Sequence, residues 1–121
     1  MTGMKTNLLI AEPDDGLRET LMRYFARQGF SVRSVNNEGE LIREMQRELP
    51  QVLLLEPEIL CGPISCGAPL VPTVVLTRTS GMLPLLRDNF LVADWYDKPA
   101  YLSDVTNSLR TVTTSPAVQP I

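Results

Sequence analysis

Acidic, hydroxyl and lysine side chains stand at the ends of the short apolar runs in this sequence, and they are the groups that could do chemistry. They are Glu12, Asp14, Glu56, Thr77 and Lys98. Carboxylates bind divalent cations, whereas a hydroxyl and an ammonium group bind the oxygens of an anion. The sequence has no histidine, which excludes a Ser-His-Asp or Cys-His nucleophile and a His-ligated zinc site.

Composition further limits the kinds of protein that this chain could be. The chain has 121 residues, enough for one domain, and hydrophobic residues make up 44% of it. Its formal net charge of -3 argues against nucleic acid as a partner. Cys61 and Cys66 are too few for a disulfide framework, and we expect ordinary thiols in a loop, with a local disulfide as the alternative. The N-terminal residues match neither a signal peptide nor a membrane span, so we expect a cytoplasmic protein without membrane contact.

Apolar runs alternate with amphipathic segments along the chain. Strands are predicted at 7–11, 51–55, 73–77 and 93–97, with a half-buried edge strand at 30–34. Helices are predicted at 16–28, 37–49 and 101–110, with a short helix at 80–89 disturbed by Gly81 and Pro84. Segment 57–72 holds four prolines and predicts an irregular connection with at most one helical turn.

This order predicts an α/β fold with a doubly wound, five-stranded parallel sheet whose third helix is shortened or irregular. In such a fold the functional site lies beyond the carboxyl ends of the strands. The five carboxylate, hydroxyl and lysine residues named above lie at these ends. The domain is expected to cover 1–110, and 111–121 has the composition of a tail or linker.

Four motifs resemble the receiver domains of two-component response regulators. L-L-I-A-E-P-D-D-G-L-R is similar to the family's first strand and acidic turn, and L-P-Q-V-L-L-L-E-P-E is similar to its third strand. V-P-T-V-V-L-T is similar to the fourth strand, and D-W-Y-D-K-P to the fifth strand with its lysine-proline. The resemblance covers about residues 6 to 110 and implies a flavodoxin-like (βα)5 topology and a signalling role without enzymatic activity.

In that family, acidic residues hold Mg²⁺ at a phosphoacceptor aspartate, while a hydroxyl and a lysine bind the phosphoryl oxygens. The resemblance places Glu12 at the first acidic position, Thr77 at the hydroxyl and Lys98 at the lysine. It also places Trp95 at the switch aromatic, three residues before the lysine.

Two positions depart from the family pattern. Pro13 stands where a second metal-binding carboxylate is expected, and Glu56 stands where the acceptor aspartate is expected. The extra methylene of Glu56 moves its carboxylate by about 1.5 Å, which a near-attack arrangement does not tolerate. Asp14 either replaces the lost ligand, giving a metal set of Glu12, Asp14 and Glu56, or only caps the following helix. We therefore expect no cofactor, with Mg²⁺ as the weaker alternative.

The favoured hypothesis is a phosphorylation-independent pseudo-receiver in which the Glu56 carboxylate pairs with Lys98, with Thr77 as an optional further partner, and resembles the phosphorylated state. In the alternative hypothesis, this ion pair has a purely structural role and only stabilises the end of the sheet. Competing functions are a working phosphoacceptor receiver with an atypical Mg²⁺ site and a small nucleotide-binding or enzymatic protein. The turn after the first strand is acidic and lacks a glycine-rich phosphate loop, which argues against a nucleotide.

The expected partners are proteins, either a signalling kinase or an output domain. Trp95, Tyr96 and Tyr101 could form a recognition surface, because aromatic residues are common at the centres of interfaces. Trp95 could equally pack against the last helix. A homodimer through the face formed by the fourth helix, fifth strand and fifth helix is a further option. Arg18, Arg23 and Arg27 are interpreted as a solvated helix face.

Overall fold

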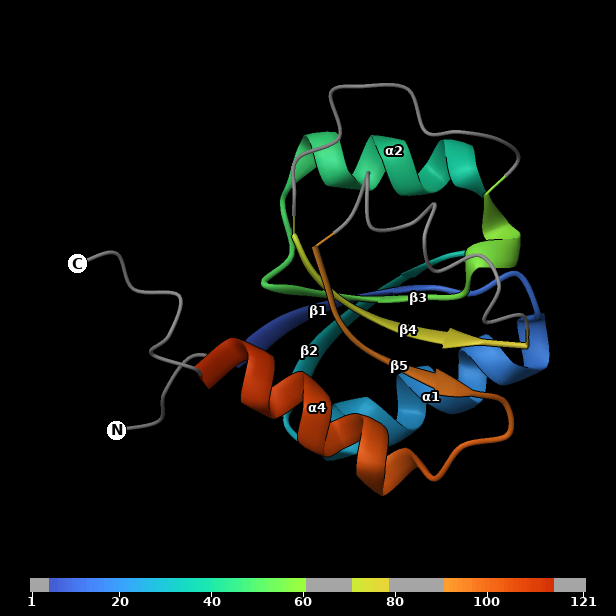
Figure 1. Ribbon diagram of the computed structural model, residues 1–121. Coiled ribbons are helices and arrows are strands. Elements are labelled where there is room, and N and C mark those ends of the chain that lie inside the picture. Colours follow the sequence, from blue (N-terminus) through green and yellow to red (C-terminus); the bar gives the residue numbers. More distant parts are fainter. Residues whose placement is uncertain (1–4, 61–70, 79–90, 115–121) are drawn as a thin grey trace.

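Five parallel strands form one sheet in the order β2-β1-β3-β4-β5. The computed structural model describes residues 5–60, 71–78 and 91–114. The strands are β1 (Thr6–Ala11), β2 (Phe30–Val35), β3 (Val52–Leu55), β4 (Pro72–Thr77) and β5 (Leu91–Asp97). Helices α1 (Asp15–Arg27) and α4 (Leu102–Thr114) cover one face of the sheet, and α2 (Glu38–Arg47) covers the other (Figure 1). The predicted fold class is confirmed.

The central strands are apolar on both faces because helices cover both faces. Leu53 and Leu55 belong to a buried cluster with residues of α2, whereas Val52 and Leu54 belong to a second cluster with residues of α1 and α4. β2 lies at an edge of the sheet and is only partly buried, as its alternating pattern predicts. Full burial of such a leucine contributes about 1.5–3 kcal/mol, so the two clusters fix the strand register.

The helix ends follow signals in the sequence. Asp14 is the N-cap of α1, and its Oδ2 accepts a hydrogen bond of 2.8 Å from the backbone N–H of Leu17. Asn37 caps α2 in the same way through the N–H of Glu40. Gly29 follows α1 with a φ of 97°, a left-handed conformation that favours glycine.

Some local predictions differ from the structure. α4 continues to Thr114, so the first residues of the predicted tail are helical. α2 ends at Arg47, and Leu49, expected on its buried face, is 49% exposed. The segment after β3 begins with one 3-10 turn, η1 (Pro57–Ile59), which agrees with the single helical turn allowed there by the sequence. The predictions for Cys61, Cys66 and the helix at 80–89 lie outside the described residues.

No helix in the described ranges is both long and apolar enough to cross a membrane. All strands point the same way, so their carboxyl ends share one edge of the sheet (Figure 1). The residues that follow these ends are therefore brought together there.

Candidate functional site at the carboxyl edge of the sheet

Backbone hydrogen bonds extend the sheet by one residue and thereby position both glutamates of the site. The N–H of Glu12, just after β1, donates to the carbonyl of Val35 at 3.1 Å. The N–H of Glu56, just after β3, donates to the carbonyl of Ala11 at 2.9 Å. Because β1 and β3 are neighbours in the sheet, the two glutamates begin side by side.

Lys98 reaches this pair from the end of β5, two strands away from β3. Its Nζ lies 2.9 Å from Oε1 of Glu12 and 2.7 Å from Oε1 of Glu56. The contact with Glu12 has hydrogen-bond geometry, whereas the contact with Glu56 is an ion pair without that alignment. The side chains of Glu12 and Glu56 are 3% and 1% exposed, and that of Lys98 is 11% exposed. The three residues form a buried ionic triad, Glu12–Lys98–Glu56.

The second oxygen of each glutamate is held by the backbone of the next turn. Oε2 of Glu12 accepts a hydrogen bond of 3.0 Å from the N–H of Asp14. Oε2 of Glu56 accepts one of 3.1 Å from the N–H of Glu58, which makes Glu56 the N-cap of η1. Each carboxylate is therefore fixed in orientation, with its Oε1 directed at the lysine.

Burial and ion pairing act in opposite directions on Lys98. Burial lowers the pKa of its ammonium group, and the carboxylates of Glu56 and Glu12 raise it. The carboxylates together outweigh burial, so the net pKa lies above the ordinary value of a lysine. The ammonium group is therefore charged throughout the physiological pH range.

Thr77 lies at the end of β4, between β3 and β5, and is completely buried. Its carbonyl accepts a hydrogen bond of 2.8 Å from the N–H of Lys98, which ties the lysine backbone to β4. This backbone hydrogen bond brings Thr77 to the same edge of the sheet as Lys98, and the role of its hydroxyl stays a prediction.

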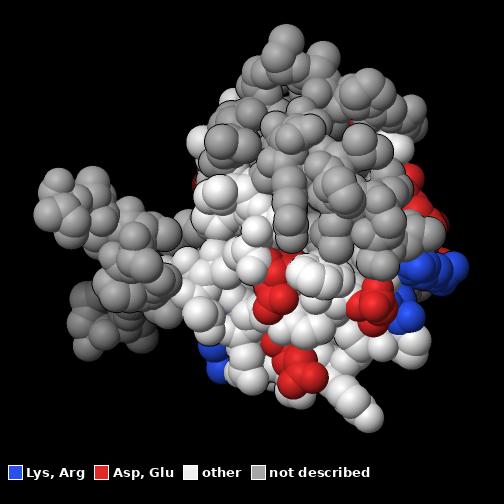
Figure 2. All heavy atoms as spheres, viewed as in Figure 1, with Lys and Arg blue, Asp and Glu red and all other residues white. Residues whose placement is uncertain are grey.

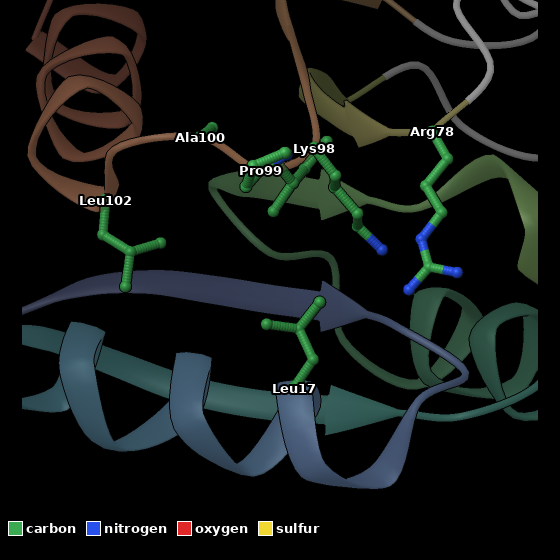
Figure 3. Close-up of a pocket in the computed structure, with 7 residues that line it drawn as sticks. Leu17, Arg78, Lys98, Pro99, Ala100 and Leu102 are labelled. Carbon is green, nitrogen blue, oxygen red and sulfur yellow. The ribbon is translucent and has the colours of Figure 1, made fainter.

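A groove of about 460 Å³ opens beside the triad, between the starts of α1 and α4. It is lined by Leu17, Leu76, Arg78, Lys98, Pro99, Ala100 and Leu102. In Figure 3 the ammonium of Lys98 and the guanidinium of Arg78 point toward the same space near the end of β1, and Leu17 projects from α1 on the other side. The groove is largely apolar, and Lys98 connects it to the triad.

Comparison by sequence identifies no relative. No protein-family model matches the chain. No curated protein matches it either.

Solved structures do match the fold. A two-component response regulator from Clostridium difficile has a TM-score of 0.80 at 18% identity, covering 92% of this chain and 98% of that one. The non-phosphorylated HemR receiver domain from Leptospira biflexa has a TM-score of 0.76 at 21% identity, covering 97% and 99%. A CheY-like receiver domain from Methylobacillus flagellatus has a TM-score of 0.72 at 13% identity, covering 89% and 98%. The chain has the receiver-domain fold.

The receiver-domain fold raises the question of a Mg²⁺ ion, which the residues at this edge do not fit. Each oxygen of Glu12 and Glu56 already contacts Lys98 or a backbone N–H. Oδ2 of Asp14 is engaged as the cap of α1, and Pro13 has no side-chain oxygen. Within residues 5–60, 71–78 and 91–114, no three acidic or cysteine side chains converge as a metal site. Of the two interpretations of Asp14, the structure thus displays the capping role.

Trp95, which the sequence resemblance assigns to the switch aromatic, is 42% exposed. Tyr101 is 80% exposed at the start of α4. Tyr96 does not join them, because it packs in the cluster under α1 and α4 and its hydroxyl donates to the carbonyl of Asp104 at 3.0 Å. The predicted aromatic surface therefore reduces to Trp95 and Tyr101.

Two features of the site were not predicted. Arg18 was assigned to a solvated face, but its side chain is 19% exposed and its NH1 donates to the carbonyl of Glu12 at 3.1 Å. Asp94 links β5 to α4, since its Oδ2 accepts a hydrogen bond of 2.6 Å from Ser108. No spacing in the sequence indicates either contact, because Arg18 reaches a backbone carbonyl across the turn before α1 and the Asp94 contact depends on the packing of α4.

Proposed function

We propose that this chain is a receiver-type signalling module that acts through protein–protein contact, without phosphoryl transfer to Glu56. The observation that carries the proposal is the buried triad at the phosphoacceptor position. Every carboxylate oxygen of the two glutamates contacts Lys98 or a backbone N–H, and a positive charge already lies 2.7 Å from the carboxylate that stands in for the acceptor aspartate. The likeness to response-regulator structures supports the signalling part of the proposal.

Glu56 would hold the site in one charge arrangement that resembles a phosphorylated receiver. A carboxylate carries less charge than a phosphoryl group, so the resemblance lies in the position of the charge and in its pairing with Lys98. A static pair of this kind suits a module that presents one surface at all times.

A phosphoryl donor tests the proposal directly. The protein is incubated with Mg²⁺ and acetyl phosphate, and its intact mass is followed together with Trp95 fluorescence. We expect no gain of phosphoryl mass and no fluorescence change on adding beryllofluoride. The matched control is the Pro13→Asp/Glu56→Asp variant, which restores the carboxylates of the family pattern.

A gain of phosphoryl mass by the wild-type chain would favour the competing function, a working receiver with an atypical site. A saturable change of Trp95 fluorescence when a nucleotide is added separately would favour the small nucleotide-binding or enzymatic class instead. Either result contradicts the pseudo-receiver.

The partners are proposed to be a signalling kinase, an output domain or a second copy of this chain. The face over β5 and α4 is mainly uncharged with separate acidic groups, while Lys and Arg lie at its margins (Figure 2). Such a surface suits a protein better than a phosphate backbone.

The homodimer is tested by sedimentation velocity over a range of protein concentrations. We expect self-association that weakens in Trp95→Ala, because an exposed tryptophan contributes strongly when an interface buries it. Tyr24→Phe, on α1, serves as the control. A sedimentation coefficient that matches the monomer at every concentration would contradict the dimer and leave the kinase or output domain as partner.

A further inference from the structure

The Glu12–Lys98–Glu56 triad has the composition of a small cation site. Two carboxylates surround a single positive charge, with their Oε1 atoms 2.9 and 2.7 Å from it. The backbone N–H groups of Asp14 and Glu58 hold the outer oxygens, so both Oε1 atoms are directed at one point. Nζ of Lys98 occupies that point.

We propose that the Lys98 ammonium is the resident cation of this site, tethered to the chain, and that it excludes divalent metal ions from the two glutamates. The inference extends the proposed function, because it specifies what keeps the site in one charge state. In a receiver that depends on Mg²⁺ the corresponding lysine accompanies the metal, whereas here the ammonium lies against both inward-facing carboxylate oxygens and Pro13 supplies no further oxygen ligand.

The geometry of the triad supports the exclusion of divalent metal ions from the two glutamates. Mg²⁺ requires near-octahedral oxygen ligands at about 2.0–2.1 Å. The two oxygens that face inward are occupied by the ammonium, and the two that face outward are occupied by backbone donors. A metal ion could enter only by breaking these contacts and by approaching Nζ of Lys98, which repels it.

Charge supports the same conclusion. Glu12 and Glu56 contribute two negative charges and Lys98 one positive charge, so the buried triad keeps a net charge of -1 by this arithmetic. Without the lysine charge, the pair would carry -2, which a divalent ion would balance. Removal of one positive charge is therefore predicted to convert a closed site into a metal site.

The experiment compares the full chain with Lys98→Met, which keeps the approximate volume of the side chain and removes its charge. MgCl₂ and MnCl₂ are the probes, without any phosphoryl donor. Binding is measured by the rise in thermal unfolding midpoint and by the loss of the free Mn²⁺ signal in electron paramagnetic resonance. We expect no saturable response from the wild-type chain and at least tenfold tighter Mn²⁺ binding by Lys98→Met.

The matched control is Lys98→Met/Glu12→Gln, which should lose the gained response because one carboxylate is missing. Lys98→Gln serves as a second variant if Lys98→Met does not fold without metal, since its neutral amide can still donate to a glutamate. Wild-type amide signals of Asp14 and Glu58 provide a further readout, and Mn²⁺ should leave them unbroadened.

Saturable Mn²⁺ binding by the wild-type chain with broadening at Asp14 and Glu58 would overturn the inference. Folded Lys98→Met and Lys98→Gln variants without a metal response would also overturn it. Wild-type binding of Mn²⁺ without phosphoryl gain contradicts the tethered cation alone. Phosphoryl gain contradicts the proposed function, so the two failures can be told apart.

Discussion

Lys98 carries the charge balance of the triad, and its removal leaves two buried carboxylates without a partner. We predict that Lys98→Met lowers the free energy of unfolding in metal-free buffer by about 3–5 kcal/mol, the usual effect of breaking a buried pair from one side. Glu12→Gln should cost less, because Lys98 and Glu56 then form a neutral pair. Urea unfolding at neutral pH, followed by circular dichroism, measures both variants.

A fully neutral site provides the control for this prediction. Lys98→Met/Glu12→Gln/Glu56→Gln should recover part of the loss, because no buried charge is left unpaired. If Lys98→Met proves no less stable than Glu12→Gln, the triad does not carry the charge balance described here.

At the scale of single residues, sequence reasoning found the pair but not the triad. The pairing of Glu56 with Lys98 was predicted from the resemblance to receiver domains together with their places at strand ends, and the structure has it at 2.7 Å. The second contact of Lys98, to Glu12, was not predicted, since strand order places the backbones but not the reach of a flexible lysine. The backbone N–H groups that orient the two glutamates were not predicted either, because strand order does not say where a glutamate side chain points.

At the scale of elements, Asp14 decides how α1 begins. We predict that Asp14→Ala lowers the free energy of unfolding by about 1 kcal/mol, because the N–H of Leu17 loses its acceptor. Asp15→Ala is the control, since its carboxylate forms only an exposed pair with Arg18 and should contribute less. Chemical denaturation measures both. An equal or larger loss in Asp15→Ala would show that capping by Asp14 is not the main stabilising contact of this turn.

The strands and helices were largely predictable because their apolar residues repeat at strand or helix spacing. The register of β5 was not. Its pairing with β4 shifts between Thr73 and Val74, so that Thr73 pairs with Val92 and Val74 with Asp94. The extra residue changes which side chains of β5 face α2, and no periodicity in the sequence indicates such a bulge. The exposure of Trp95 follows from this register together with the edge position of β5.

At the scale of the whole molecule, the triad joins strands that are not neighbours. β5 is separated from β1 by β3 and β4, yet Lys98 connects the end of β5 to the residues after β1 and β3. The protonation state of one side chain is therefore linked to the stability of the whole sheet. Because the folded state raises the pKa of Lys98, folding and proton binding support each other at this site.

This linkage predicts how stability changes at alkaline pH. Below the unfolded-state pKa of about 10.4 both states hold the proton, so the contribution of Lys98 is fully present. Above that value the unfolded chain releases its proton first, and the free energy of unfolding falls until the pH passes the folded-state pKa. The slope from this group should approach about 1.4 kcal/mol per pH unit. Urea unfolding of the wild-type chain and of the fully neutral triple variant at successive pH values isolates the contribution of Lys98. Parallel curves of the free energy of unfolding for the two proteins above pH ~10.4 would contradict a raised pKa at Lys98.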